Sequence, residues 1–202
     1  MIPEFILYSD FTNPFCYALE QRLRELRASD RVAWRGVHLN RTHQVGSPVP
    51  SGLGETTQPT DLAYEVGLVR QAWPDLPIAI PTIRSDPGDA NRAMAAFLLI
   101  DDVQARAFKH ACYQAFWRKG WDLSDRSVLA TLARGVKLAP TAVDLLDHPH
   151  IAATAALWQR QWEETGVRTL PLLIRRDGTM LAGLADRSRI DRFLEGDVQD
   201  RT

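Results

Sequence analysis

The stretch FTNPFCYALEQRL, residues 11–23, decides the interpretation of the whole chain because it joins a short apolar run to a helix. Asn13 is a strong N-cap residue, since its side-chain oxygen accepts a hydrogen bond from a backbone N–H two or three residues later. Pro14 fits the first helical position, where its missing N–H is no loss. Apolar residues then recur every three or four positions, with Arg and Glu between them. The pattern predicts a helix that begins directly after Asn13.

Cys16 lies in the first turn of this expected helix, and two interpretations of it stay open. Buried, unreactive cysteines are common, so the stretch is in one view only a well-capped helix. In the other view, the unpaired N–H groups and the positive dipole end favour a thiolate. Asn13 stands where a second cysteine would complete a Cys-x-x-Cys motif. Because an amide cannot attack a disulfide, dithiol exchange through this motif is excluded.

The order of the expected elements predicts an α/β domain interrupted by helices. Strands at 5–9 and 32–39 flank the first helix, and a β-α-β unit normally has parallel strands. Residues 40–60 are rich in Gly and Pro and predict a long loop. Two further strands, 170–174 and 180–182, are joined by an Asp-Gly turn signal.

Helical spacing dominates the middle of the chain. Thr60 and Ser124 are the expected N-caps of two of these helices, and Gly135 and Gly166 are expected terminators. The expected helices cover 60–73, 90–100, 103–119, 124–135 and 151–165, followed by a last one capped by Asp186. We therefore expect a first part at 1–59, a helical insertion at 60–160 and a second part at 161–202.

Composition excludes several classes of protein. Apolar residues make up 45% of the 202 residues, which is enough for a core without disulfides or metal. A formal net charge of −1 argues against wrapping nucleic acid or coating an anionic membrane. The two cysteines, Cys16 and Cys112, are expected to be free thiols in a reducing compartment. With no signal-peptide pattern and no run long enough to span a bilayer, we expect a cytoplasmic location.

These motifs together resemble the DsbA-like clan of thioredoxin-fold proteins. The stretch YSDFTNPFCYALEQRL (8–23) resembles cytosolic DsbA-like oxidoreductases, and it is similar to 2-hydroxychromene-2-carboxylate isomerases and kappa-class glutathione transferases. The stretch FWRKGWDLSDRSVLATLARGVKL (116–138) matches a segment late in the helical insertion of these families, and residues 166–171 match their Gly-Val-x-x-x-Pro strand. The resemblance implies a thioredoxin-like domain with a helical insertion domain.

The resemblance also implies roles for the first helical turn. In the oxidoreductases the position of Asn13 is the attacking cysteine and that of Cys16 is the resolving one. In the isomerases and transferases a serine at the first position supports the thiolate of bound glutathione, and the NH2 group of Asn13 can donate to sulfur in the same way. Pro14 is assigned to glutathione binding and Phe15 to the substrate cleft.

Other positions follow from the same resemblance. Leu170 and Pro171 fit the cis-proline element that pairs with the backbone of glutathione or a peptide. Asp186 and Arg187 match an Asp-Arg pair at the γ-glutamyl end of glutathione, although Asp186 is equally a plain N-cap. Asp89 and Arg92 match an Asn-x-x-Arg segment that faces the site, with Asp in place of Asn.

Three hypotheses about function result. The first is an enzyme that binds glutathione or a similar low-molecular-weight thiol and uses its sulfur for isomerisation or transfer on a small apolar substrate. The second is a monothiol thiol-disulfide oxidoreductase that uses Cys16. The third is a non-catalytic relative that binds thiols or a partner protein. We expect no metal, nucleic acid or membrane partner, and a homodimer because relatives are often homodimers.

Several remaining side chains are better explained by structure than by chemistry. Cys112 lies on an apolar helical stripe and is expected in the core, while a Cys16–Cys112 disulfide stays open. His38 and His43 are expected at the surface, with an acid–base role as the alternative. The loop histidines at 148 and 150 offer too few ligands for zinc, and the tryptophans at 117, 121, 158 and 162 are expected to build core.

Overall fold

The computed structural model describes residues 3–39 and 62–196. Strand β1 (Phe5–Ser9), helix α1 (Pro14–Glu25) and strand β2 (Val32–Gly36) form the expected β-α-β unit, with a short 3-10 helix η1 (Ser29–Arg31) before β2. The two strands are parallel, as predicted, and Leu7 lies opposite Trp34.

The second half of the sheet comes from the end of the chain. Strand β3 (Leu172–Arg175) pairs antiparallel with β1, and β4 (Met180–Ala182) pairs antiparallel with β3. The strand order is therefore β2-β1-β3-β4, with β2 and β4 at the edges. Helix α7 (Arg187–Glu195) follows β4 and packs against α1. The predicted hairpin and the predicted last helix are both confirmed.

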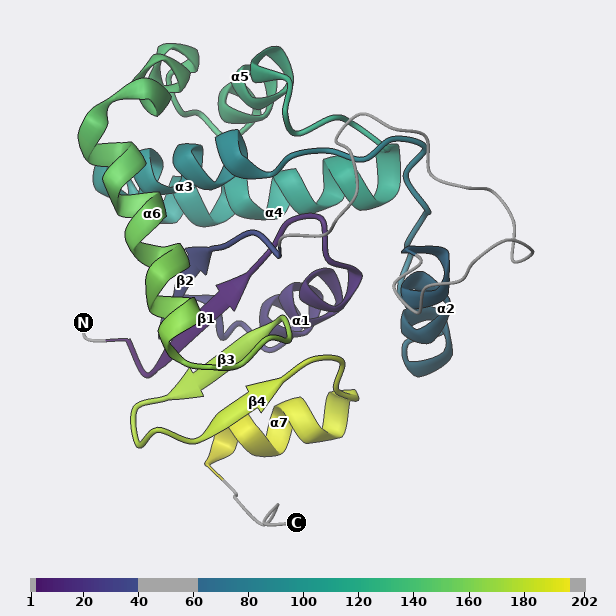
Figure 1. The fold of residues 1–202 in the computed structure, drawn as a ribbon. Coiled ribbons are helices and arrows are strands. Elements are labelled where there is room, and N and C mark those ends of the chain that lie inside the picture. The colour runs from purple at the N-terminus through teal and green to yellow at the C-terminus, as the bar shows by residue number, and fades with distance from the viewer. Residues whose placement is uncertain (1–2, 40–61, 197–202) are drawn as a thin grey trace.

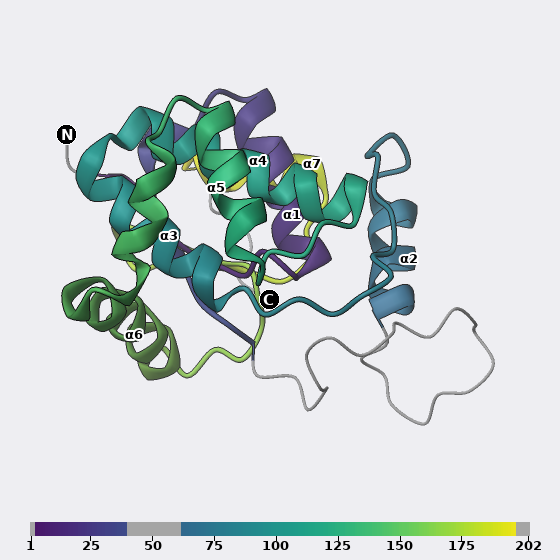
Figure 2. The same ribbon diagram turned by 90° about the horizontal axis from the view of Figure 1, so that it is seen from above.

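The helices between β2 and β3 form the helical insertion (Figure 1). They are α2 (Leu62–Ala72), α3 (Gly88–Ile100), α4 (Asp102–Lys119), α5 (Arg126–Gly135), the 3-10 helix η2 (Pro140–Asp147) and α6 (Pro149–Glu164). Figure 1 shows α3, α4 and α5 beyond the edge strand β2, and α7 beside β4 at the other edge. Figures 1 and 2 both show α2 and α6 on opposite sides of the molecule. The domain boundaries at 59/60 and 160/161 stay a prediction.

Two predicted elements differ from the observed ones. Strand β2 ends at Gly36 instead of Leu39, because side chains replace the sheet hydrogen bonds beyond it: His38 N donates to Gln159 (2.9 Å) and Leu39 N to Asp10 (3.1 Å). Helix α5 is capped by Asp125 instead of Ser124. The hydroxyl of Ser124 donates to Asp122 (2.7 Å) and so belongs to the preceding turn.

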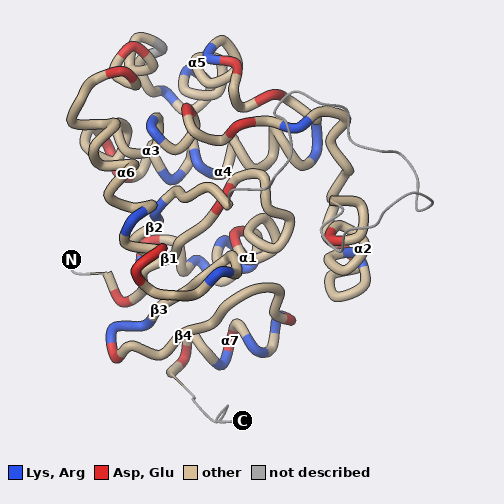
Figure 3. The backbone as a smooth tube through the Cα atoms, viewed as in Figure 1, with Lys and Arg blue, Asp and Glu red and all other residues tan. Residues whose placement is uncertain are grey.

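Apolar burial holds these layers together, and charge is spread thinly over them. The core is continuous from the sheet into α3 and α4, with Trp117 and Phe108 fully buried. Figure 3 shows acidic and basic segments of both signs scattered over the helices and strands. Within the described ranges, no helix combines the length and the apolar character that crossing a bilayer requires. The expected loop at 40–60 and the expected cap Thr60 lie outside the described residues.

Candidate functional site

Asn13 caps α1 with one end of its amide and leaves the other end unused. Its Oδ1 accepts hydrogen bonds from Phe15 N (2.9 Å) and Cys16 N (3.1 Å). The residue is only 3% exposed. Its Nδ2 makes no hydrogen bond to any described residue, yet this atom is not among those sealed from solvent. A donor therefore stands unengaged at the positive end of the α1 dipole.

Cys16 lies directly behind this cap, facing the interior. The residue is 1% exposed, and its Sγ accepts a hydrogen bond from Asp10 N (3.4 Å). Tyr113 of α4 lies on the inner side: burial raises the pKa of Tyr113 well above its usual range, and charge on Cys16 raises it further. The Tyr113 and Ser9 hydroxyls are 2.7 Å apart. The sulfur is thus a buried neighbour of the helix end.

Asp10 is a buried carboxylate that organises the turn between β1 and α1. It accepts hydrogen bonds from the backbone and the hydroxyl of Thr12 (both 2.7 Å) and from Leu39 N (3.1 Å). Its Oδ2 also lies 3.3 Å from His38 Nδ1. Burial alone would raise the pKa of the Asp10 carboxyl, but the hydrogen bonds and charge of His38 and the bonds from Thr12 outweigh it, so this pKa lies below its usual value.

Asp10 and His38 are the residues whose association the sequence analysis missed. His38 was expected at the surface, and it is half-exposed, but its ring is held by a buried carboxylate. The available signal was topological. Asp10 follows β1 and His38 follows β2, and the carboxyl ends of adjacent parallel strands meet at one edge of a sheet, where ligands bind.

The segment before β3 lies beside the first turn of α1. The Leu170–Pro171 peptide bond is cis, and Leu170 is buried. The Pro171 carbonyl accepts from Gly183 N (2.9 Å), whereas no described residue pairs with the backbone N–H or C=O of Leu170. A small hollow is lined by Phe15, Pro171 and Ala185, among others. The structure therefore brings the α1 turn, the proline turn and the start of α7 together.

Asp186 and Arg187 follow this hollow, and both already have partners. Asp186 caps α7, which is one of the two roles expected for it. Its carboxylate accepts hydrogen bonds from Ser188 Oγ (2.7 Å) and Arg189 N (2.8 Å). These hydrogen bonds, from Ser188 first, hold the pKa of Asp186 below its usual value. Arg187 donates to Asp75 (2.8 Å), and its guanidinium lies 4.5 Å from the centre of the Trp73 ring.

Asp89 and Arg92, at the start of α3, belong to a different set of contacts. Arg92 donates to Asp89, which also accepts from Arg126 of α5 (2.8 Å). Arg126 in turn pairs with Asp147 (2.6 Å). None of these described contacts reaches Asn13. The expected role of Asp89 and Arg92 in the site therefore stays a prediction.

The side chains that the sequence analysis assigned to structure are mostly where it placed them. Cys112 and Cys16 are both buried thiols, and no disulfide joins them. Burial raises the pKa of the Cys112 thiol well above its usual value. His148 caps α6 by accepting from His150 N (3.2 Å), and the described residues contain no cluster of metal ligands. His43 lies outside the described residues.

Comparison with known proteins adds the family to this geometry. The sequence matches the DSBA-like thioredoxin domain over residues 4–195. Among curated proteins, no sequence matches the chain. Solved structures match its fold at identities too low to carry an activity over to this chain.

Three of these structures span the range of named activities. A probable DsbA oxidoreductase from Streptomyces coelicolor has a TM-score of 0.76 at 20% identity, over 98% of this chain and 91% of the other. A 2-hydroxychromene-2-carboxylate isomerase has 0.65 at 21%, over 98% and 93%. The cytosolic disulfide reductase DsbM from Pseudomonas aeruginosa, solved with GSH, has 0.66 at 18%, over 95% and 97%. With a family match over nearly its whole length and this sheet, insertion and helix cap, the chain belongs to the DSBA-like thioredoxin domain family.

Proposed function

We propose that the chain binds glutathione or a similar small thiol at the N-terminus of α1 and uses the thiol's sulfur for isomerisation or transfer on a small apolar substrate. The observation that carries this proposal is that the helix cap uses only one of the two polar atoms of the Asn13 side-chain amide. Its Oδ1 caps the helix, while its Nδ2 has no partner among the described residues. An amide N–H donates to a sulfur anion, and the helix end adds positive potential. Asn13 therefore suits the support of a thiolate that arrives with the ligand.

The neighbouring residues fit an extended small thiol. The unpaired main chain of Leu170 suits a ligand backbone, and Pro171 and Phe15 line the hollow beside it. Pro14 occupies the first position of the helix, next to Asn13. The amino end of the ligand is assigned to Asp186, which is exposed at the start of α7.

Arg187 lies next to Asp186 and already has partners. Its guanidinium pairs with Asp75 (2.8 Å), lies 3.8 Å from Glu25 and covers Trp73, so a ligand carboxylate must compete with these carboxylates to bind it. A bound thiol would supply the nucleophilic sulfur. The protein orients it, excludes water and supports its charge, which is the main route by which such a site accelerates a reaction.

Proton transfer is assigned to the Asp10–His38 pair. Asp10 contacts the ring at Nδ1 (3.3 Å), and its carbonyl accepts from Asn13 N (3.2 Å), so the pair lies next to the cap. A histidine oriented through one ring nitrogen by a carboxylate is a common acid–base arrangement. Relatives named as oxidoreductases and isomerases make an enzyme plausible in this family.

Burial disfavours the alternative in which Cys16 forms mixed disulfides. The sulfur is 1% exposed beneath the first turn of α1, so exchange would require that turn to open. Thiol exchange needs access as well as thiolate character. The thiol of a ligand, in contrast, needs only the outer surface of the turn.

Three substitutions of Asn13 test the proposal without confusing capping with thiol support. Asn13→Ser keeps a cap acceptor and a donor, Asn13→Asp keeps the acceptor but removes the donor, and Asn13→Ala removes both. In calorimetric titrations with glutathione at pH 7, we expect the wild type and the Ser variant to bind. The Asp variant should bind about tenfold more weakly or worse, the effect of losing a charge-assisted hydrogen bond.

Thermal unfolding of the same variants separates the two roles. The Asp and Ser variants should unfold close to the wild type, and only the Ala variant should lose stability. Absence of binding at millimolar glutathione, or equal binding by the Asp variant, contradicts the proposal. Binding without turnover of small apolar electrophiles would assign the chain to the non-catalytic thiol binders instead.

A further inference from the structure

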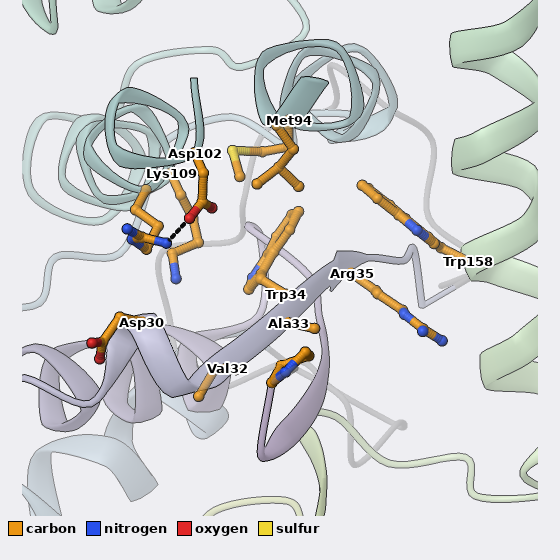
Figure 4. Close-up of a pocket in the computed structure, with 12 residues that line it drawn as sticks. Asp30, Val32, Ala33, Trp34, Arg35, Met94, Asp102, Lys109 and Trp158 are labelled. Atoms are coloured by element: carbon orange, nitrogen blue, oxygen red, sulfur yellow. Dashed lines mark hydrogen bonds and ion pairs between the residues drawn. The ribbon is translucent and has the colours of Figure 1, made fainter. Parts of the chain in front are cut away.

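A second cavity lies away from the thiol site, between the edge strand β2 and helices α3, α4 and α6 (Figure 4). Its volume is about 330 Å³, within the range of small-molecule sites. None of Asn13, Cys16, Pro171 or Asp186 lines it. It is therefore a separate place at which a ligand can bind, on the opposite edge of the sheet from β4.

The walls of this cavity are largely aromatic and apolar. Trp34 rises from β2 and Trp158 comes from α6, with ring centres 6.2 Å apart and planes at 85°. Met94 lies above Trp34 in Figure 4, and Leu98 is one turn further along α3. The two indole rings contact each other edge to face, and the surface that they leave toward the cavity suits an aromatic group.

Arg35 brings an uncompensated positive charge to the rim. Its Nη1 donates to the Tyr8 hydroxyl and to Gln161 Oε1 (both 2.8 Å), and both partners are neutral. No ion pair joins it to a carboxylate in residues 3–39 or 62–196. A guanidinium without an anionic partner, at the mouth of an apolar cavity, favours an anionic ligand.

The other cations of the cavity already have partners. Arg106 pairs with Asp102, one turn earlier on α4. Lys109 Nζ lies 2.8 Å from Glu20. Asp30 and Asp102 also line the cavity, so the negative charge of a ligand is opposed on that side. One unpaired guanidinium beside two carboxylates suits a ligand with a single negative charge and disfavours a dianion such as a phosphate monoester.

The floor of the cavity supplies further polar groups. Arg31 O and Val37 N bond to β1, and in a parallel pair the intervening alternate residues turn their N–H and C=O groups to the other side. Because β2 is an edge strand, Trp34 also presents its main chain there.

We propose that this cavity binds a small aryl carboxylate. The aromatic ring packs against the accessible surfaces of Trp34 and Trp158, and the carboxylate binds Arg35. This site is separate from the proposed thiol site, and its ligand needs no thiol to bind.

Calorimetry with three matched probes tests the ligand class. We expect 3-phenylpropionate to bind the wild-type protein, and 3-phenylpropanol and phenyl phosphate to bind about tenfold more weakly or worse, the scale of one charge-assisted hydrogen bond. Arg35→Gln should weaken 3-phenylpropionate binding to a similar extent. The control Arg134→Gln, an exposed residue of α5 that does not line the cavity, should stay within about twofold of the wild type.

Nuclear magnetic resonance locates the bound probe. The indole N–H signals of Trp34 and Trp158 should shift on addition of 3-phenylpropionate, and the side-chain amide signals of Asn13 should not. If Arg35→Gln fails to fold, Trp158→Leu removes one aromatic wall, and its binding should fall while the fold is kept. No binding at 5 mM probe (about 3 kcal/mol), equal binding of the alcohol, unchanged affinity in the folded variants, or competition by glutathione overturns the proposal.

Discussion

At the scale of single residues, Asp10 contributes more to the site than its place in a turn would indicate. Its buried carboxylate accepts hydrogen bonds from Thr12 N in the turn before α1 and from Leu39 N after β2, and it lies 3.3 Å from the ring nitrogen Nδ1 of His38. These bonds connect the end of β1, the end of β2 and the turn that leads into α1. The cost of burying this charge is met by several hydrogen bonds at once, which is the usual condition for a buried carboxylate.

The stability that Asp10 confers should depend on pH. Its folded pKa is depressed, so its contribution is present above the unfolded pKa of about 3.9 and is lost as the pH falls through the folded value. Asp10→Asn should lower the free energy of unfolding at pH 7 by about 1–3 kcal/mol. Urea unfolding at several pH values should show this difference shrink below pH ~4.

The exposed Asp144 is the matched control for this series, since it makes no described ion pair or hydrogen bond through its side chain. Asp144→Asn should leave the unfolding free energy unchanged at each pH. A difference for Asp10→Asn that stayed constant from pH 7 to pH 3 would show that packing, and not charge, is responsible.

Asn13→Cys should restore the missing half of a Cys-x-x-Cys motif. Cys16 already lies three residues later, buried in the first turn of α1. The variant should form a disulfide with Cys16 and catalyse insulin reduction by dithiothreitol above the wild-type background. Loss of the cap should cost about 1 kcal/mol of stability. The double variant Asn13→Cys/Cys16→Ser, which cannot form this disulfide, is the control. If the single variant reduced insulin no faster than the double variant, Cys16 would not take part in the exchange.

At the scale of elements, periodicity and capping predicted most helices and strands, because these depend on neighbours in sequence. Asn13 and Asp186 cap the helices that were expected of them. The 3-10 helix η2 was missed because it has no long apolar period. The Asp10–His38 contact and the early end of β2 were missed because each depends on side chains distant in sequence.

Gly36 marks a close approach of β2 to α3. A Cβ built there would lie 2.3 Å from Asn91 Oδ1 and 2.7 Å from the Trp34 ring. Gly36→Ala should therefore lower stability by about 1–3 kcal/mol through overpacking. Adding Asn91→Ala should recover part of the loss, because it removes one of the two clashing groups. Denaturant unfolding of both variants measures this.

Gly67 of α2 provides the opposite case, since a Cβ there would meet nothing within 4 Å. Gly67→Ala should stabilise the protein by about 0.5–1 kcal/mol, the helix-propensity difference. Equal effects at the two glycines would rule out close packing as the cause at Gly36.

At the scale of the whole molecule, α4 fastens the helical insertion to the thioredoxin-like part. Lys109 Nζ lies 2.8 Å from Glu20 of α1, and both side chains are 2% exposed. Trp117 Nε1 donates to the Phe11 carbonyl (2.9 Å) across the same boundary. The connection is therefore both ionic and aromatic, and it ends at the helix that carries Asn13.

Breaking the buried pair should cost more than replacing it. Lys109→Met leaves Glu20 charged and buried, and should lower stability by about 3–5 kcal/mol. Glu20→Met/Lys109→Met should recover most of this loss, because no isolated charge remains. Arg106→Met, which breaks the more exposed pair with Asp102, should cost about 0.3–0.5 kcal/mol. Urea unfolding supplies the cycle, and a double variant no better than Lys109→Met would contradict it.

The labelling rates of the two buried thiols should report on two different opening motions of the molecule. Cys16 sits in the first turn of α1 and Cys112 in the middle of α4, and both are closed to solvent in the native state. A thiol reagent can reach the first when a single helical turn frays, but it reaches the second only when the layers separate. Under native conditions the two labelling rates should therefore differ, and they should converge as denaturant makes global opening dominant. Mass spectrometry of the labelled peptides would then measure the rates of local opening and of complete unfolding in the same wild-type protein.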